Sequence, residues 1–223
     1  KSFETGLNLI KKNNSSTLIN GPISKTTFLK GKHNGITEFL AAKTKSLNEV
    51  MLIFNKELSV SPITTHVHIN KVTEKIKKKL IINKIQNINE FYKKFLGFKP
   101  NIAITGLNPH CETFTGKNIE KKEILPAIKL LKKKKIKVSG PFSADTIFLK
   151  ENRKKFDVIL GMYHDQVLSP IKTLFEYDAI NITLGLPFIR ISPDHGPNEK
   201  MVGKNLSSPL SLYKAISFLE RLK

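Results

Sequence analysis

The apolar residues of this chain follow two patterns: short unbroken runs, and longer segments in which they recur at helical spacing. The apolar runs include IAIT at 102–105 and the unbroken VILGM at 158–162, which is typical of a strand buried on both faces of a sheet. Between about 70 and 95, apolar residues recur at near-helical spacing and predict one or two amphipathic helices, which Gly97 ends. Strands that alternate with helices predict βαβ units and a mostly parallel sheet.

Other segments predict further elements, two of which carry specific expectations. The segment 137–149 predicts a strand with a turn at Gly140-Pro141. The segment 208–223 predicts a helix that starts at Ser208 and places on one face Leu212, Ala215, Ile216 and Leu219. The remaining expected elements are a strand over 16–20 before a Gly21-Pro22 turn, a helix over 36–46, a hairpin or two strands over 49–66, a helix over 124–135 and two short strands within 179–196.

The length and composition predict a folded α/β protein. A chain of 223 residues can bury a sizeable core, and we treat residues 1–223 as one domain. No apolar run approaches the roughly 18 residues that cross a bilayer, and the first residues carry neither Met nor a signal-peptide pattern. The single cysteine, Cys111, excludes an internal disulfide and suits a reducing compartment. We therefore expect a cytoplasmic protein, or a fragment of one, without a membrane partner.

The net charge of +20 would favour nucleic-acid binding in any uncharacterised chain. The lysines, however, fall in runs such as Lys77–Lys79 and Lys132–Lys135, beside predicted helices and without the interleaved aromatic residues that stack on bases. We interpret most of this charge as solvated helix surface and expect no nucleic-acid partner. Attraction of anionic substrates is a secondary effect of the same charge.

Three histidines each follow an apolar, strand-like run: His66, His110 and His164. The carboxyl ends of parallel strands meet at one edge of a sheet, so side chains there can converge although they are far apart in sequence. Three imidazoles with an open coordination position describe a catalytic divalent-metal site. The alternative is that each histidine is a solitary polar residue in a loop. Oxygen or amide groups that could orient the imidazoles come from Thr64, Thr65, Asn108, Asp165 and Gln166.

Further candidate residues stand near these histidines or downstream of them. Cys111, directly after His110, is either a thiolate ligand or a bystander. Lysine, amide and arginine groups can together hold a phosphate or carboxylate, and a second cluster offers Lys172, Asn181 and Arg190. The loop Asp194-His195-Gly196 could bring backbone close to a nucleotide, although neither a GxGxxG fingerprint nor a P-loop is present.

Several strings of the chain resemble one family, the 4-hydroxythreonine-4-phosphate dehydrogenases of the vitamin B6 pathway. They are GLNPH at 106–110, GPFSADT at 140–146, MYHDQ at 162–166, NITLGLPFIR at 181–190 and DHG at 194–196. The resemblance runs in order from Gly21-Pro22 through the terminal helix. The family's amino-terminal part has no counterpart here, which supports the expectation of a truncated copy.

The resemblance implies a fold of the isocitrate/isopropylmalate-dehydrogenase type, with a mixed, mostly parallel sheet, flanking helices and a cleft between two subdomains. It implies a homodimer with the active site at the subunit interface, a divalent metal (Zn, Mg or Co) and NAD or NADP. It implies His66, His110 and His164 as the metal ligands. The substrate contacts that it implies are Thr37, Lys172, Asn181 and Arg190.

The implied reaction is oxidation of the secondary alcohol of 4-phosphooxy-L-threonine to a 3-oxo acid, which loses carbon dioxide to give 3-amino-2-oxopropyl phosphate. The general base is Asp145 or Asp165, and the alternative role of Asp145 is that of a helix N-cap. Lys25 is expected to contact the substrate or the cofactor, or to lie on the surface. By resemblance to related dehydrogenases, the adenosine of the cofactor would lie along Asp194, His195 and Gly196.

The chain departs from the family pattern at three places. Ile36 stands where the family usually has a histidine before Thr37, so one substrate contact is lost or comes from a neighbour such as His33. Residues 111–115 replace a glycine-rich stretch, and Pro197-Asn198 follows the DHG string. Two alternatives stay open. The loss of the histidine at Ile36 leaves room for a dehydrogenase of threonate or erythronate 4-phosphate. The net charge of +20 and the missing amino-terminal portion leave room for a non-catalytic metal-binding or nucleic-acid-binding module.

Overall fold

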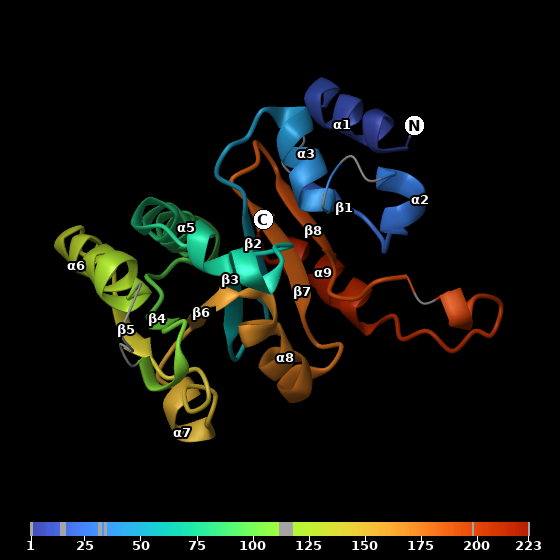
Figure 1. The fold of residues 1–223 in the computed structure, drawn as a ribbon. Helices are drawn as coiled ribbons and strands as arrows, with labels where there is room; N and C mark the ends of the chain where they lie inside the picture. Colours follow the sequence, from blue (N-terminus) through green and yellow to red (C-terminus); the bar gives the residue numbers. More distant parts are fainter. Residues whose placement is uncertain are drawn as a thin grey trace. The chain divides into compact units, whose positions relative to one another are not determined.

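The structure is a computed structural model that describes residues 2–13, 17–30, 33, 35–111, 118–197 and 199–222 (Figure 1). Contacts divide the chain into two compact units. Unit 1 comprises Lys1–Met51 and Tyr177–Lys223, and unit 2 comprises Leu52–Glu176. Unit 1 is therefore built from both ends of the chain, and unit 2 from one continuous segment. The prediction that 1–223 forms one family domain stays a prediction.

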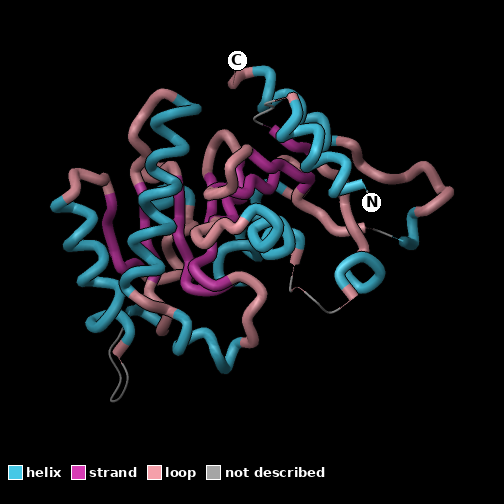
Figure 2. Tube along the Cα trace, turned by 90° about the horizontal axis from the view of Figure 1, so that it is seen from above, coloured by secondary structure: helices cyan, strands magenta, loops and turns pink. Residues whose placement is uncertain are grey.

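Unit 2 is a mostly parallel sheet with helices beside it (Figure 2). Its strands lie in the order β2-β3-β6-β4-β5, where β2 and β3 form an antiparallel hairpin and the other neighbours run parallel. The strands are β2 (Val50–Phe54), β3 (Ser59–Thr64), β4 (Ile102–Thr105), β5 (Val138–Phe142) and β6 (Val158–Tyr163). The helices are α4 (Val72–Lys75), α5 (Lys78–Phe91), α6 (Leu125–Lys133), α7 (Lys150–Arg153) and α8 (His164–Phe175).

The apolar run at 158–162 forms the central strand that its pattern predicts. Strand β6 lies between β3 and β4, and residues Val158 to Met162 are all buried. The predicted hairpin and both predicted helical segments of this unit are also present. Gly97, with φ of 80°, ends the helical stretch that continues from α5, as the sequence predicts.

The expected turn at Gly140-Pro141 is wrong, because both residues lie inside β5. A Cβ at Gly140, whose φ is 131°, would come within 2.4 Å of the Ile104 carbonyl oxygen on β4. The register of the two strands shifts between Ala103 and Thr105. This glycine therefore marks a strand irregularity where two backbones approach closely. Pro141 is accommodated because β5 is at the end of the strand order of unit 2.

Unit 1 holds the strands β1 (Thr17–Ile19), β7 (Ile180–Leu184) and β8 (Ile189–Pro193), in the order β1-β8-β7. Strand β8 pairs in parallel with β1 and antiparallel with β7. Its helices are α1 (Ser2–Lys12), α2 (Lys25–Leu29), α3 (Ile36–Thr44) and α9 (Leu210–Glu220). A hydrophobic cluster forms around Leu29, Ile36 and Leu40. In each unit the strands form a mixed sheet with helices beside it, and this confirms the expected mixed, mostly parallel fold class.

The terminal helix α9 is present, but its buried face differs from the expected one. Leu212 and Ile216 are 40% and 43% exposed, whereas Ser211, Ala215 and Phe218 are buried. The Ser211 hydroxyl donates to the Ala179 carbonyl at 2.6 Å. Apolar residues occur around most of this helix, so their spacing alone does not identify the side that packs.

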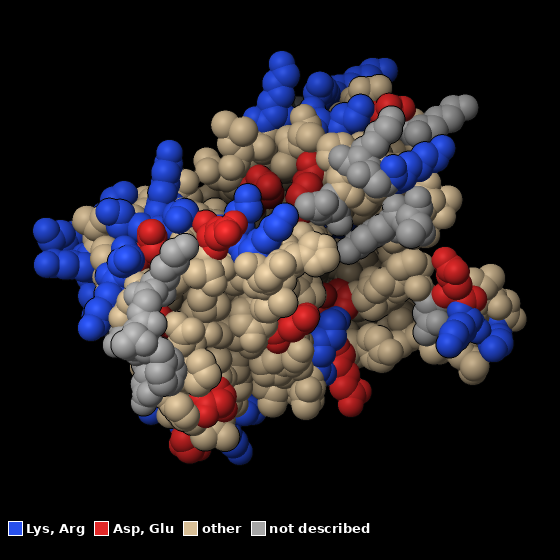
Figure 3. Space-filling model, viewed as in Figure 1, with Lys and Arg blue, Asp and Glu red and all other residues tan. Residues whose placement is uncertain are grey.

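The lysine runs are exposed, as predicted for solvated helix surface. Lys77–Lys79 stand at the start of α5 and Lys132–Lys135 at the end of α6, and all seven are exposed. Figure 3 shows Lys and Arg side chains gathered on the surface where Figure 1 draws α5 and α6. In the part of the chain that the structure describes, no helix combines the length and apolar character needed to cross a membrane. The cytoplasmic location stays a prediction.

A buried phenol in unit 2 predicts a loss of stability at alkaline pH. Tyr92 is 3% exposed and donates to Ser59 Oγ at 2.8 Å. Burial raises the pKa of Tyr92 above its ordinary value of 10. Below pH 10 the phenol is protonated in both states. Above pH 10 it ionises first in the unfolded chain, so the free energy of unfolding should fall by up to about 1.4 kcal/mol per pH unit.

Urea unfolding at pH 8, 10 and 11 measures this effect. In Tyr92→Phe the free energy of unfolding should fall less steeply above pH 10, because phenylalanine has no proton to release. The same variant should lose about 1 kcal/mol at pH 8 through the missing hydrogen bond. Equal slopes above pH 10 for both proteins would contradict the expectation.

Candidate functional site

The three histidines stand at the carboxyl ends of three adjacent parallel strands of unit 2, as the sequence predicts. His66 follows β3 by two residues, His164 directly follows β6, and His110 lies in the loop after β4. These strands lie in the order β3-β6-β4. The parallel sheet therefore directs all three segments to the same edge.

The structure brings two of these histidines together. The ring centroids of His66 and His164 are 5.9 Å apart and the planes are inclined by 37°. The Nδ1 atom of His164 lies 2.7 Å from the Asp165 carboxylate. A carboxylate that accepts the Nδ1 proton fixes the tautomer in which Nε2 carries a lone pair. This donor set suits a divalent ion of the zinc type.

His110 does not join this pair. It is exposed, and it adopts a left-handed conformation with φ of 54°, as does Cys111 with φ of 58°. Within the described ranges, no three His, Cys, Asp or Glu side chains gather closely enough to bind one metal ion. One chain thus offers two neighbouring imidazoles and a third that is separate.

Gln166 ties the ends of β4 and β6 together. Its Oε1 accepts hydrogen bonds from the Met162 N–H at 2.6 Å and the Thr105 hydroxyl at 2.9 Å. Its Nε2 donates to the Gly106 carbonyl at 2.9 Å. One side-chain amide therefore fixes the spacing between the segments that carry His110 and His164. That Gln166 orients the imidazoles stays a prediction.

Glu120 also lies near these loops, and the sequence did not indicate it as a site residue. Glu120 is 1% exposed, and its carboxylate accepts hydrogen bonds from the loop that leads to His110. In the sequence it belongs to the charged stretch EKKE at 120–123, which is indistinguishable from a solvated helix surface. No local signal would have identified it.

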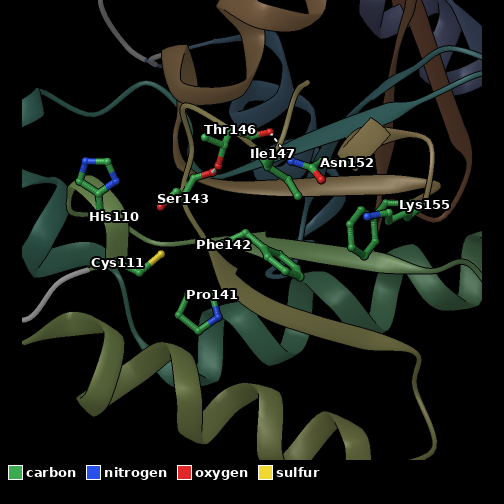
Figure 4. Close-up of a pocket in the computed structure, with 10 residues that line it drawn as sticks. His110, Cys111, Pro141, Phe142, Ser143, Thr146, Ile147, Asn152 and Lys155 are labelled. Carbon is green, nitrogen blue, oxygen red and sulfur yellow. Dashed lines mark hydrogen bonds between the residues drawn. The ribbon is translucent and has the colours of Figure 1, made fainter. Parts of the chain in front are cut away.

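A cavity of about 370 Å³ opens beside His110 and Cys111 in unit 2 (Figure 4). The Phe142 and Phe156 rings, with centroids 5.4 Å apart, form part of its wall. Burial raises the pKa of the Cys111 thiol, which keeps it protonated at neutral pH. The other lining residues are Pro141, Ser143, Thr146, Ile147, Asn152 and Lys155.

In unit 1, Arg190 is the centre of a buried polar cluster. It is 4% exposed, its Nε donates to Asn20 Oδ1 at 2.7 Å, and its Nη1 donates to Thr183 Oγ1 at 3.3 Å. Burial lowers the pKa of Arg190 to about 10, an effect that nearby Glu38 opposes. The guanidinium therefore stays charged at neutral pH and is held in a fixed orientation. Asn20 was not among the candidates, because 170 residues separate it from Arg190.

Two other expected substrate contacts lie in the same unit. The Thr37 hydroxyl is 3.5 Å from the hydroxyl of Thr183, which also accepts from Arg190. Asn181 Oδ1 is buried and has no hydrogen-bond partner among the described residues. Burying an amide oxygen without a hydrogen-bond donor costs free energy of folding. Asn181 Oδ1 is therefore a candidate to accept a hydrogen bond from a ligand. Lys172 belongs to unit 2, where it is half-buried in α8.

The remaining candidates lie in loops or at helix starts. Asp145 is exposed in a series of turns between β5 and α7, so the N-cap alternative is wrong, because the next helix starts only at Lys150. Lys25 begins α2, and its side chain lies outside the described part of the structure. The DHG loop follows β8: Asp194 N–H donates to Ser211 Oγ at 3.0 Å, His195 Nδ1 lies 3.1 Å from the Gly196 carbonyl oxygen, and Gly196 is exposed.

Ile36 is buried in the hydrophobic cluster of unit 1 rather than placed in a polar site. His33 packs edge-on against Phe39, with centroids 5.5 Å apart. These contacts favour the loss of the histidine contact over its replacement by His33. Of the other two departures, residues 112–115 and Asn198 lie outside the described residues.

The strand order and the flanking helices define an α/β protein, and its fold is similar to that of isocitrate dehydrogenase. Isocitrate dehydrogenase from Methylococcus capsulatus superposes with a TM-score of 0.58, at 14% identity over 97% of this chain and 70% of that chain. The chain belongs to the family described as pyridoxal phosphate biosynthetic protein PdxA, whose model matches residues 1–219.

Individual relatives agree with this family. The 4-hydroxythreonine-4-phosphate dehydrogenase of Sulfurihydrogenibium sp. is 41% identical over 99% of this chain and 69% of its own length. The crystal structure of the Klebsiella pneumoniae 4-hydroxythreonine-4-phosphate dehydrogenase has a TM-score of 0.79, at 29% identity over 98% of this chain and 68% of that chain. The chain therefore spans about two thirds of the length of these relatives.

These findings confirm the predicted family, fold class and enzyme class. The family assigns the chain to the dehydrogenases, which are oxidoreductases, and to pyridoxal phosphate biosynthesis. A dehydrogenase of this kind indicates a nicotinamide cofactor and a phosphorylated substrate.

Proposed function

We propose that this protein catalyses the metal- and NAD(P)-dependent oxidation of 4-phosphooxy-L-threonine. The 3-oxo acid that forms would lose carbon dioxide and give 3-amino-2-oxopropyl phosphate. The observation that carries the proposal is the family match over residues 1–219, together with a relative that is 41% identical and named for this substrate.

We assign the divalent metal to His66, His110 and His164. The proximity of the His66 and His164 rings, and the carboxylate on His164 Nδ1, support these two as ligands. The separate position of His110 supports a site completed across a homodimer. In such a site, His110 of one subunit would be the third ligand of the metal ion bound by His66 and His164 of the other. The ion is Zn, Mg or Co, and a site of imidazoles favours zinc or cobalt over magnesium.

The substrate's phosphate would bind at the polar cluster of unit 1. Arg190 supplies a charged, pre-oriented guanidinium and Thr37 a hydroxyl. The unpartnered Oδ1 of Asn181 would accept a hydrogen bond from a donor group of the same substrate. Lys172, in α8 of unit 2, is proposed separately as a substrate contact on the basis of the family resemblance. The cofactor's adenosine would lie along Asp194, His195 and Gly196, after β8.

When bound, the metal would polarise the substrate hydroxyl and the nicotinamide would accept a hydride. Asp145 is the base that takes the hydroxyl proton in this proposal. Asp165 is the weaker candidate because its Oδ1 is already hydrogen-bonded to His164 Nδ1, at 2.7 Å. Lys25 contacts the substrate or the cofactor. The oxidation removes a proton and a hydride, and the carboxylate then leaves as carbon dioxide with its bonding electron pair left on the substrate.

The direct test measures metal content and NADH or NADPH formation from 4-phosphooxy-L-threonine. We expect turnover and about one divalent ion per subunit. A protein that binds the ion but leaves this substrate unchanged would contradict the substrate. A protein that binds neither metal nor nicotinamide would contradict the dehydrogenase assignment and favour the non-catalytic alternative.

A second candidate substrate follows from Ile36, which places an apolar side chain where the family usually has a histidine. The alternative is D-threonate or D-erythronate 4-phosphate, which carry a hydroxyl in place of the amino group. We expect kcat/KM for 4-phosphooxy-L-threonine to exceed that for either hydroxy acid by at least about tenfold, because a site that hydrogen-bonds one polar group rejects its substitute. The reverse order of kcat/KM would favour the sugar-acid phosphate as the substrate.

A further inference from the structure

We infer that Glu120 is a positioning residue that holds the His110 loop in place. The inference rests on the proposed function in so far as His110 is a metal ligand there. Glu120 begins the helical stretch that leads into α6, and it follows Asn108 of the His110 loop by 12 residues. Its side chain is 1% exposed, which is unusual for a glutamate.

The carboxylate of Glu120 accepts several hydrogen bonds from this loop. Its Oε1 accepts from the Leu107 N–H and the Asn108 N–H, each at 2.9 Å. The Asn108 side-chain amide donates to Oε1 at 3.3 Å and to Oε2 at 3.1 Å. Hydrogen bonds to an ionised acceptor are stronger than neutral ones, and here they fix two consecutive backbone units.

The same loop continues directly to His110. The Cys111 N–H donates to the Asn108 carbonyl at 3.1 Å, which closes the turn around the histidine. His110 and Cys111 both occupy the left-handed region, which non-glycine residues adopt only when their surroundings hold them there. The contacts of Glu120 at Leu107 and Asn108 supply such a constraint immediately before the turn.

A buried carboxylate is a costly way to gain stability, since its desolvation offsets much of what its hydrogen bonds contribute. An apolar side chain would fill the same space without that penalty, but it would leave two backbone N–H groups without an acceptor. The benefit of Glu120 therefore lies in the order of the loop. Glu120→Leu is expected to loosen the loop even where the thermal midpoint changes little.

The test compares three variants, Glu120→Leu, Glu120→Gln and Glu123→Leu. Glutamine keeps one oxygen for the two backbone N–H groups, so it should retain part of the effect. Glu123 is the matched control, because it lies one turn along the same helical stretch and accepts instead from the Lys78 N–H at 2.5 Å. A thermal midpoint close to that of the wild type establishes that each variant is folded.

The first readout needs no metal and no substrate. Hydrogen exchange of the Leu107 and Asn108 amides should accelerate by at least about tenfold in Glu120→Leu and by less in Glu120→Gln. Exchange in β6, as an internal reference, should stay unchanged. Unchanged exchange at Leu107 and Asn108 in a folded Glu120→Leu protein would overturn the inference.

The second readout is affinity for Zn²⁺, measured by competition with a chelator. Glu120→Leu should weaken binding by about 10–100-fold, as loss of a group behind a ligand does, while Glu123→Leu should not. Equal affinity of Glu120→Leu and the wild type would overturn the link to His110. If the wild type itself binds no Zn²⁺, the proposed function fails, and hydrogen exchange still decides whether Glu120 holds the loop.

Discussion

Replacing His66 by alanine should remove the bound metal and lower kcat/KM by about 10³-fold or more. His66 supplies one of the two imidazoles that the structure places together, 5.9 Å from that of His164. A divalent ion held by three ligands binds weakly when one is removed, and its contribution to the reaction is worth several kcal/mol. Metal content by elemental analysis and steady-state kinetics of the same sample measure both effects. His164→Ala should behave in the same way.

The matched control for this variant is His68→Ala. His68 lies two residues further along the same segment and is exposed. Its replacement should leave metal content and kcat/KM unchanged. A His66→Ala protein that keeps its metal and its activity would show that the pair is an ordinary loop feature, and the assignment of all three histidines would fail with it.

Arg190→Lys should raise KM for the phosphorylated substrate by about 30-fold or more, with a smaller change in kcat. The structure holds the guanidinium through Asn20 and Thr183 in a buried position, so lysine would retain the charge but lose the fork that binds a phosphate through two parallel hydrogen bonds. A loss of about 2 kcal/mol in a buried charged contact corresponds to this factor. Initial rates over a range of substrate concentrations separate KM from kcat.

Arg221→Lys is the control, because Arg221 is exposed at the end of α9 in the same unit. It should leave KM unchanged. If Arg190→Lys changed the thermal midpoint and kcat but left KM intact, Arg190 would be a structural residue of unit 1, and the phosphate would have to bind elsewhere.

The sequence predicted those features that depend on local pattern. The unbroken apolar run of β6 identified a central strand, and the strand ends located His66, His110 and His164 correctly. The helices α3, α5 and α6 lie where the sequence predicts helices, and Gly97 ends the helical stretch that continues from α5. Family resemblance then named the candidates, since spacing alone gave only weak support for Arg190 and Asn181.

The features that were missed depend on contacts between distant segments. Gly140-Pro141 carries the signal of a turn, yet the approach of β4 turns it into a strand irregularity. Glu120 resembles a solvated residue until the loop at 107–108 is placed against it. Asn20 becomes recognisable only when β1 pairs with β8 and brings it to Arg190. Local sequence does not encode which partner a buried polar group will find.

The construction of unit 1 from both ends of the chain also affects the order in which the protein forms during synthesis. Strand β1 pairs with β8 through Thr17 and Ile189, so this pairing can form only after residue 189 has been synthesised. Unit 2 is continuous and is complete in sequence by Glu176. Domains fold as units as they emerge, and contacts between distant segments form late. The segment that carries the paired histidines therefore precedes, in the order of synthesis, the strand that carries Arg190.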